Sequence, residues 1–195
     1  MLNIILGLEN LIKCSNFNFF MKDVFNVINE LENSRQERNI SRDSIEFISL
    51  LCRSIKPINI LEIGCFNGYS ALWLSLYSNN VFTIEKYPVY AALALKNFSK
   101  ANVKNIELIH GDALDVMENM DKKFDIILID AQKNEYKLYL KLSLKLLNNN
   151  GIIFIDNTIS HKDSMTEFFE YVERSTLFHL ELNIGKGLMM ITKIH

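Results

Sequence analysis

The sequence is poor in the residues that build disulfide frameworks, linkers and strongly charged surfaces. It has 3 cysteines, 2 prolines and 7 glycines in 195 residues, and its formal net charge is -2. Cys14, Cys52 and Cys65 are scattered and form no C-x-x-C pair, which argues against disulfide, zinc and redox sites and fits a reducing cytoplasm. The small net charge excludes a global electrostatic attraction to nucleic acid or anionic lipid.

Long hydrophobic runs, internal repeats and low-complexity tracts are also missing. The opening MLNIILGL is apolar, but it has no basic flank, and Glu9, Asn10 and Lys13 follow before it reaches membrane length. We therefore expect a first amphipathic helix, no signal peptide and no membrane partner. The prediction is a single domain over residues 1–195, with N-terminal helices over 1–56 and a Rossmann-like core over 57–195.

Short apolar runs alternate with helical stretches from residue 59 onward, which indicates a mostly parallel α/β sheet. Because they are rich in Ile, Leu, Phe and Val, five buried strands are expected at 59–64, 81–85, 105–110, 124–130 and 151–156. Helices are expected at 17–31, from the N-cap Ser41 to Ile55, and at 69–77, 88–100, 113–120, 135–147 and 163–174. Residues 177–182 and 188–193, around Gly185-Lys186-Gly187, predict an antiparallel hairpin that closes the sheet.

Glycines and acidic residues follow the first three predicted strands, where doubly wound sheets bind ligands. The segment from Gly64 to Gly68 has G-x-x-x-G spacing without the third glycine of the dinucleotide fingerprint, so it favours a cofactor with a sulfonium cation over a pyrophosphate. Glu85 follows Gly64 at the distance at which Rossmann proteins bind ribose hydroxyls, and Asp112 could accept a hydrogen bond from an adenine amino group. Each carboxylate alone could also be a solvated strand end or a helix cap.

Oxygen ligands stand at the ends of the fourth and fifth predicted strands. Asp130, Asp156 and Asn157 should lie on neighbouring strands, about 4.8 Å apart, with no His or Cys beside them. This set favours Mg²⁺, Mn²⁺ or Ca²⁺ over zinc. Lys133 follows Asp130 by three residues and is a candidate base, because a bound cation would acidify a substrate hydroxyl. The alternatives are that Lys133 is an exposed helix lysine and that Asn157 lies in an ordinary turn.

Six segments together resemble the cation-dependent O-methyltransferase family of catechol and caffeoyl-coenzyme A methyltransferases: LEIGCFNGYS, FTIEKYP, HGDALDV, ILIDAQKNEY, IIFIDNTI and GKGLMMITK. They occur in family order and spacing from about residue 40 to the C terminus. The resemblance implies an S-adenosylmethionine cofactor, a divalent cation and a homodimer. It also implies a class I methyltransferase fold, a seven-stranded, mostly parallel sheet with one antiparallel strand and helices on both faces.

The resemblance also implies roles for single residues. The methionine end of the cofactor would be lined by Glu62, Gly64, Phe66, Gly68 and Ser70, the ribose held by Glu85, and the adenine bordered by Asp112 and Ala113. Asp130, Asp156 and Asn157 would bind the metal, Asp130 would also border the cofactor, and Lys133 with Asp130 would serve catalysis. Cys65 and the short N-terminal segment depart from the family pattern, so the resemblance does not fix the substrate.

Two acceptors are therefore expected: a catechol-like small molecule with a second metal-binding oxygen beside its hydroxyl, or a modified uridine. DAQKNEY resembles the bacterial tRNA 5-hydroxyuridine methyltransferases, which act at the wobble position, and Arg35, Arg38 and Arg42 could contact phosphates or lie in a solvated loop.

Two other classes of protein are kept as alternatives, a non-catalytic cofactor-binding module and a nicotinamide-dependent enzyme. The set of candidate ligands with Lys133 argues against the first, and the incomplete glycine fingerprint argues against the second. The histidines form no ligand cluster in the sequence: His110, His161, His179 and His195. His161 follows Asn157 by four residues and could reach the rim of the site.

Overall fold

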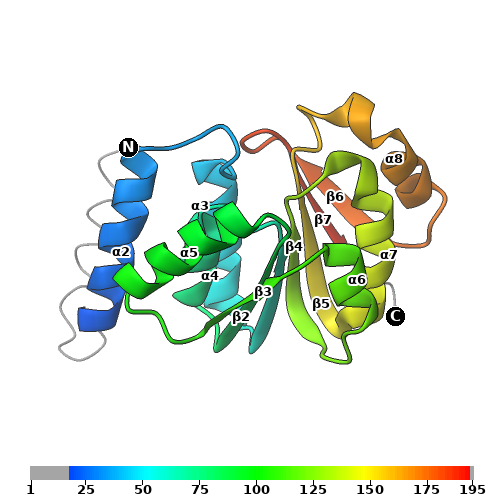
Figure 1. Ribbon diagram of the computed structural model, residues 1–195. Helices are drawn as coiled ribbons and strands as arrows, with labels where there is room; N and C mark the ends of the chain where they lie inside the picture. The colour runs from blue at the N-terminus through cyan, green and yellow to red at the C-terminus, as the bar shows by residue number, and fades with distance from the viewer. Residues whose placement is uncertain (1–17, 194–195) are drawn as a thin grey trace.

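A central sheet with helices on both faces organises the computed structural model, which describes residues 18–193 (Figure 1). The amphipathic helix expected at the N terminus, Cys14 and His195 lie outside the described residues. The strands are β1 (Asn59–Ile63), β2 (Asn80–Glu85), β3 (Ile106–His110), β4 (Phe124–Ile129), β5 (Leu147–Asp156), β6 (Phe178–Leu182) and β7 (Leu188–Thr192).

The seven strands form one sheet in the order β3-β2-β1-β4-β5-β7-β6. Strands β1 to β5 pair in parallel, whereas β7 is antiparallel to both β5 and β6. This is the expected mostly parallel sheet with one reversed strand. The order reverses between β1 and β4, and such a switch point is where doubly wound sheets bind ligands.

The described helices are α2 (Asn18–Asn33), α3 (Arg42–Ile55), α4 (Tyr69–Ser75), α5 (Pro88–Lys100), α6 (Ala113–Glu118), α7 (Tyr136–Leu146) and α8 (Thr166–Glu173). Two 3₁₀ turns, η1 (Lys133–Glu135) and η2 (Lys162–Met165), precede α7 and α8. Helices α2 to α5 lie on one side of the sheet and α6 to α8 on the other (Figure 1). Each side has its own buried apolar cluster, so both faces of the central strands are covered.

Local signals explain the boundaries of α3. The hydroxyl of Ser41 accepts a hydrogen bond from the Ser44 backbone N–H at 3.1 Å, which is the expected N-cap. Lys56 ends the helix in the left-handed region, with its N–H bonded to the Cys52 carbonyl at 2.7 Å, and Pro57 follows.

Strand β5 begins four residues before the predicted start at residue 151, because a polar segment also pairs with β4. Phe124 pairs with Leu147 ahead of a register shift, and the Asn148 amide donates to the Asp125 carboxylate at 2.6 Å. The hydrophobic pattern does not mark such a polar strand. Strand β3 is less buried than expected, since it forms one edge of the sheet. Among the described helices, none has the length and apolar character needed to cross a bilayer.

Candidate functional site

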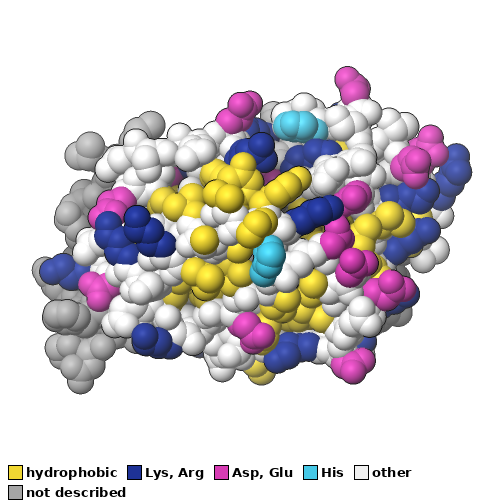
Figure 2. Space-filling view, in the orientation of Figure 1, with side chains coloured by type: hydrophobic (Ala, Val, Ile, Leu, Met, Phe, Trp, Pro, Cys, Tyr) yellow, Lys and Arg dark blue, Asp and Glu magenta, His cyan; other side chains and the backbone are white. Residues whose placement is uncertain are grey.

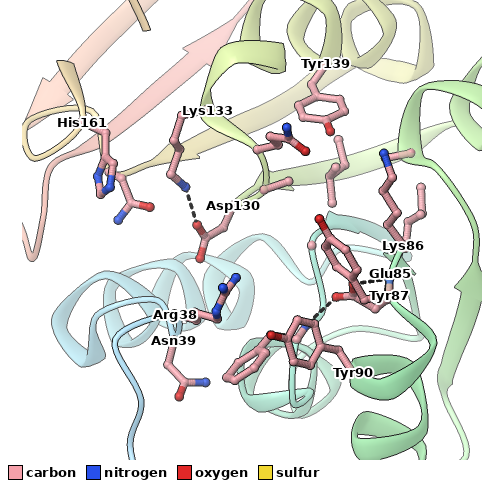
Figure 3. Close-up of a pocket in the computed structure, with 18 of the residues that line it drawn as sticks. Arg38, Asn39, Glu85, Lys86, Tyr87, Tyr90, Asp130, Lys133, Tyr139 and His161 are labelled. Atoms are coloured by element: carbon pink, nitrogen blue, oxygen red, sulfur yellow. Dashed lines mark hydrogen bonds and ion pairs between the residues drawn. The ribbon is translucent and has the colours of Figure 1, made fainter. Parts of the chain in front are cut away.

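A cavity of about 500 Å³ opens at the carboxyl ends of β1, β2 and β4, beside the switch point of the sheet (Figure 3). Its volume is in the range of small-molecule sites. The predicted site residues that line it are Gly64, Phe66, Glu85, Ala113, Asp130, Lys133 and Asn157. The structure therefore brings candidates from five segments of the chain into one cavity.

Glu85 is held rigidly at the end of β2 by two backbone N–H groups. Its Oε2 accepts from Phe66 and its Oε1 accepts from Tyr87, both at 2.8 Å. Only 6% of Glu85 is exposed, and it lines the cavity. Because each carboxylate oxygen has a second lone pair, Glu85 could also accept hydrogen bonds from ligand hydroxyls.

Neighbouring parts of the protein pack so closely against the two glycines of the G-x-x-x-G segment that no side chain fits there. Gly64 has φ +94, and a Cβ atom there would lie 2.2 Å from the Asp130 carbonyl oxygen. Gly68 has φ +83, and its Cβ atom would lie 2.4 Å from the Phe98 ring. Only a residue without a side chain fits either place. Of the two, only Gly64 also borders the cavity.

Glu62 and Ser70 lie beneath this loop and are not part of the cavity wall. The carboxyl group of Glu62 is fully buried and accepts a hydrogen bond from the Thr83 hydroxyl at 2.5 Å. Burial raises the pKa of Glu62 to about 8, although the neighbouring Ser70 and Thr83 hydroxyl groups oppose the shift. In this structure both residues support the loop from below.

At the predicted adenine end, Asp112 acts as a helix cap. Its Oδ1 accepts from the Leu114 N–H at 3.0 Å, and its Oδ2 pairs with Lys86 Nζ at 2.7 Å. The hydrogen bond from Lys86 lowers the pKa of Asp112. This is the cap that the sequence analysis kept as an alternative. Ala113 and Lys86 border the cavity at this end.

The candidate metal ligands lie together because β4 and β5 pair in register. Ile129 is the partner of Ile155, so the residues that follow them, Asp130 and Asp156, are side by side. Asp156 is fully buried, and neither of its carboxylate oxygens has a hydrogen-bond partner among the described residues. Burial, and next the charge of Asp130, raise the pKa of Asp156.

This arrangement fits a divalent cation. A buried carboxylate with two unpartnered oxygens beside a second carboxylate is costly, and a bound cation would offset that cost. Asn157, at φ 70, follows directly and lines the cavity. No group of three or more His, Cys, Asp or Glu side chains is placed to hold a metal within residues 18–193, so the candidate set is two carboxylates and one amide.

Lys133 lies at the cavity, in η1. Its Nζ atom lies 2.9 Å from Asp130 Oδ1 and 2.6 Å from the Tyr136 hydroxyl oxygen, and only 17% of the side chain is exposed (Figure 3). The alternative of an exposed helix lysine is therefore wrong. No role for Tyr136 was predicted from the sequence, although its position three residues after Lys133 was a usable signal.

Several cavity residues come from parts of the chain that the sequence analysis did not connect with the site. They include Asn39 between α2 and α3, Tyr90 in α5, and Lys186 between β6 and β7. His161 also lines the cavity, which agrees with its predicted place at the rim.

The three arginines considered for phosphate contact differ in their surroundings. Arg35 pairs with Glu32 at 3.0 Å and Arg42 pairs with Glu46 at 2.8 Å. Arg38 is the one of the three that lines the cavity.

Solved structures share this fold. An S-adenosylhomocysteine-bound methyltransferase from Podospora anserina superposes with a TM-score of 0.81 at 25% identity, covering 89% of this chain and 88% of that one. The S-adenosylmethionine complex of the O-methyltransferase TomG from Streptomyces achromogenes superposes with a TM-score of 0.76 at 23% identity, covering 87% of this chain and 88% of that one. At this level of identity the similarity shows a shared fold alone.

Sequence comparisons identify relatives and a family. A catechol O-methyltransferase of Mycobacterium tuberculosis is 31% identical over 125 residues, covering 62% of this chain but only 57% of the relative. A caffeoyl-CoA O-methyltransferase of Medicago sativa is 31% identical over 157 residues, covering 73% of this chain and 64% of that relative. The chain thus spans less than two thirds of both relatives. The O-methyltransferase family model matches residues 13–186, and the chain therefore belongs to this family, as the six sequence segments indicated.

Proposed function

We propose that the chain is an S-adenosylmethionine-dependent and divalent-cation-dependent O-methyltransferase. Its acceptor would be a catechol-like small molecule that carries a second metal-binding oxygen beside the reacting hydroxyl. The observation that carries this proposal is the grouping of Asp130, Asn157 and Lys133 in the cavity wall with Glu85, and of the buried, unpartnered Asp156 directly beside Asp130. The family membership and the cofactor complexes of similar structures support the same proposal.

When bound, S-adenosylmethionine supplies an electrophilic methyl group and the cation lowers the pKa of the hydroxyl beside it. Glu85 would accept hydrogen bonds from the cofactor hydroxyls, because its carboxylate is already fixed by two backbone groups. Asp130, Asp156 and Asn157 would hold the cation. These residues fix the relative positions of donor and acceptor, which is the main contribution that a protein makes to such a transfer.

In its neutral amine form, Lys133 would receive the proton of the acceptor hydroxyl at Nζ, while the hydroxyl oxygen takes the methyl group of the cofactor. Asp130 and Tyr136 then hold the resulting ammonium group, since both already lie within hydrogen-bond distance of Nζ. A lysine tethered at two points loses little further freedom when it reacts.

The test is methyl transfer from labelled S-adenosylmethionine to 1,2-dihydroxybenzene in the presence of Mg²⁺, with phenol as the acceptor that lacks the second oxygen. We expect transfer to the diol, and a loss of about 100-fold or more on chelation or in Asp130→Ala. Asp121→Ala is the matched control, because Asp121 is exposed and distant from the cavity in the fold.

Transfer that is indifferent to chelation and to Asp130→Ala would show that the metal assignment is wrong. Tight cofactor binding without turnover of any diol or tRNA would instead favour a non-catalytic module.

The alternative acceptor, hydroxyuridine in tRNA, has less support from the arrangement of charges. Arg35 and Arg42 are neutralised by glutamates, and the formal net charge of the chain is -2. We therefore place the small-molecule acceptor first. Label incorporated into hydroxyuridine-bearing tRNA, and into no diol, would reverse this order.

The expected cytoplasmic homodimer is part of the proposal. The buried cysteines Cys52 and Cys65 are free thiols, which is compatible with a reducing compartment. Light scattering of the purified chain would measure its molar mass, and a mass of one chain would contradict the dimer.

A further inference from the structure

Two cationic side chains of the cavity, Arg38 and Lys186, form no direct ion pair with a carboxylate in the described part of the chain. Among residues 18–193 the ion pairs take up Lys86, Lys133, Arg35 and Arg42, but neither Arg38 nor Lys186. Both line the cavity, together with Asp130 and Asn157 of the candidate metal ligands. Figure 2 shows Lys and Arg side chains and a histidine at the border of the apolar patch in the middle of this face.

Arg38 is held in a way that leaves its hydrogen-bonding edge free. Its guanidinium group lies over the Tyr90 ring, 5.6 Å from the centroid, and Tyr90 in turn meets Phe66 edge-on at 4.9 Å. Within residues 18–193 its N–H groups make no hydrogen bond or ion pair, so all five N–H donors are available to a ligand. Figure 3 shows the Arg38 side chain projecting between Asp130 and Tyr90 in this view.

Lys186 is fixed beside Arg38 by a contact between two distant loops. Its Nζ donates to the backbone carbonyl of Glu37 at 2.9 Å, which joins the β6–β7 turn to the loop that carries Arg38. An ammonium group has three protons, so this bond leaves two of them for a ligand. The whole cavity wall contains four cationic and three anionic residues, which leaves one net positive charge: Arg38, Lys86, Lys133 and Lys186 against Glu37, Glu85 and Asp130.

A second hollow of about 390 Å³ adjoins the cavity at Lys186. Glu37, Asn39 and Lys186 belong to the walls of both. The arginines of the second hollow, Arg35 and Arg42, are already paired with glutamates. Arg38 and Lys186 are therefore the cations available to an acceptor that lies beside Lys133 and extends toward the second hollow.

We infer that Arg38 and Lys186 bind an anionic substituent of the acceptor, so that the enzyme selects acidic diols over neutral ones. This inference rests on the proposed function. A guanidinium edge binds a carboxylate or phosphate through two parallel hydrogen bonds, and the lysine adds a point charge. The aromatic wall of Phe66 and Tyr90 suits the planar ring that would carry the two hydroxyls.

The experiment compares 3,4-dihydroxybenzoate with 3,4-dihydroxybenzamide, which have the same ring and hydroxyls but differ in charge. We expect kcat/KM to be about tenfold higher for the acid, the factor that one charge-assisted contact contributes in a partly exposed site. Arg38→Gln and Lys186→Gln should each bring the acid-to-amide ratio toward one. The control is Arg42→Gln, since Arg42 is paired with Glu46, and it should keep the wild-type ratio.

A second arm uses 3,4-dihydroxyphenyl phosphate to separate a general anion site from a carboxylate site. Calorimetric binding of the acid and the amide in the presence of S-adenosylhomocysteine and Mg²⁺ gives a readout that is independent of turnover. An acid-to-amide ratio of kcat/KM that is the same in the wild type and in both Gln variants would overturn the inference and leave the methyltransferase proposal intact. Failure of all three diols to bind or react would overturn the proposed acceptor class itself.

Discussion

The Nζ atom of Lys133 lies 2.6 Å from the hydroxyl oxygen of Tyr136 and 2.9 Å from Asp130 Oδ1. Tyr136 is fully buried, and Lys133 also lies over its ring at 4.8 Å from the centroid. Because a lysine ammonium group has three protons, these two contacts leave one for the cavity. Tyr136 is thus a positioning residue that fixes the direction in which Lys133 can exchange a proton.

Replacing Tyr136 by phenylalanine tests this role. Tyr136→Phe keeps the ring but removes the oxygen, so we expect kcat to fall about tenfold, the effect of losing one hydrogen bond to a charged group. The KM for S-adenosylmethionine should not change. Tyr171→Phe is the control, because Lys141 lies over the Tyr171 ring at 5.3 Å in a similar contact outside the cavity. An equal fall of kcat in both variants would contradict the positioning role.

Asp156 gives a prediction about metal binding that needs no substrate. Its two unpartnered oxygens and the neighbouring Asp130 destabilise the metal-free protein, and a cation that binds only the folded state would raise its melting temperature. We expect Mg²⁺ to raise the melting temperature of the wild type and to have no effect on Asp156→Asn. Without metal, Asp156→Asn should melt no lower than the wild type. Scanning calorimetry with and without Mg²⁺ measures both effects, and a full Mg²⁺ response in the variant would argue against Asp156 as a ligand.

The positions of the candidate ligands were predictable because they depend on strand periodicity alone. Asp130 directly follows β4 and Asp156 ends β5, both strands are covered on their two faces, and parallel pairing then places the two residues side by side. Glu85 reached the cavity for the same reason, since it ends β2. The sequence pattern therefore predicted the position of these site residues, which stand at the ends of strongly apolar strands.

The remaining wall of the cavity depends on contacts between distant loops. Lys186 and Glu37 are 149 positions apart, and no local pattern links the β6–β7 turn to the α2–α3 loop. The amide of Asn39 likewise donates to Asn67 at 2.8 Å, which joins the α2–α3 loop to the loop after β1. Such pairings arise only when the whole domain packs, so the sequence analysis did not find them.

Gly64 offers a test of the close approach between β1 and β4. In Gly64→Ala the new Cβ atom would lie 2.2 Å from the Asp130 carbonyl oxygen in a backbone conformation that L-residues avoid. We expect a loss of about 3 kcal/mol in the free energy of unfolding, measured with urea. Gly111→Ala is the control, because its Cβ atom would meet only the end of the Val116 side chain, at 2.9 Å. Similar losses in the two variants would show that the approach at Gly64 is not the cause.

Glu62 makes the stability of the protein depend on pH. Its pKa is raised from 4.5 to about 8 by burial, so its carboxyl group binds a proton in the folded protein at pH values where the unfolded chain has lost it. The stability that this proton provides is complete below about pH 4.5 and is lost as the pH rises to about 8. Glu62→Gln mimics the protonated form and has no such dependence. The free energy of unfolding of the variant should therefore rise relative to the wild type by about 1 kcal/mol for each pH unit between pH 5 and 7. Urea unfolding of both proteins at several pH values measures this difference. The contribution of Asp156 to the pH dependence cancels in the difference, because both proteins contain Asp156. A difference that stays constant across this range would mean that Glu62 is ionised in the folded protein.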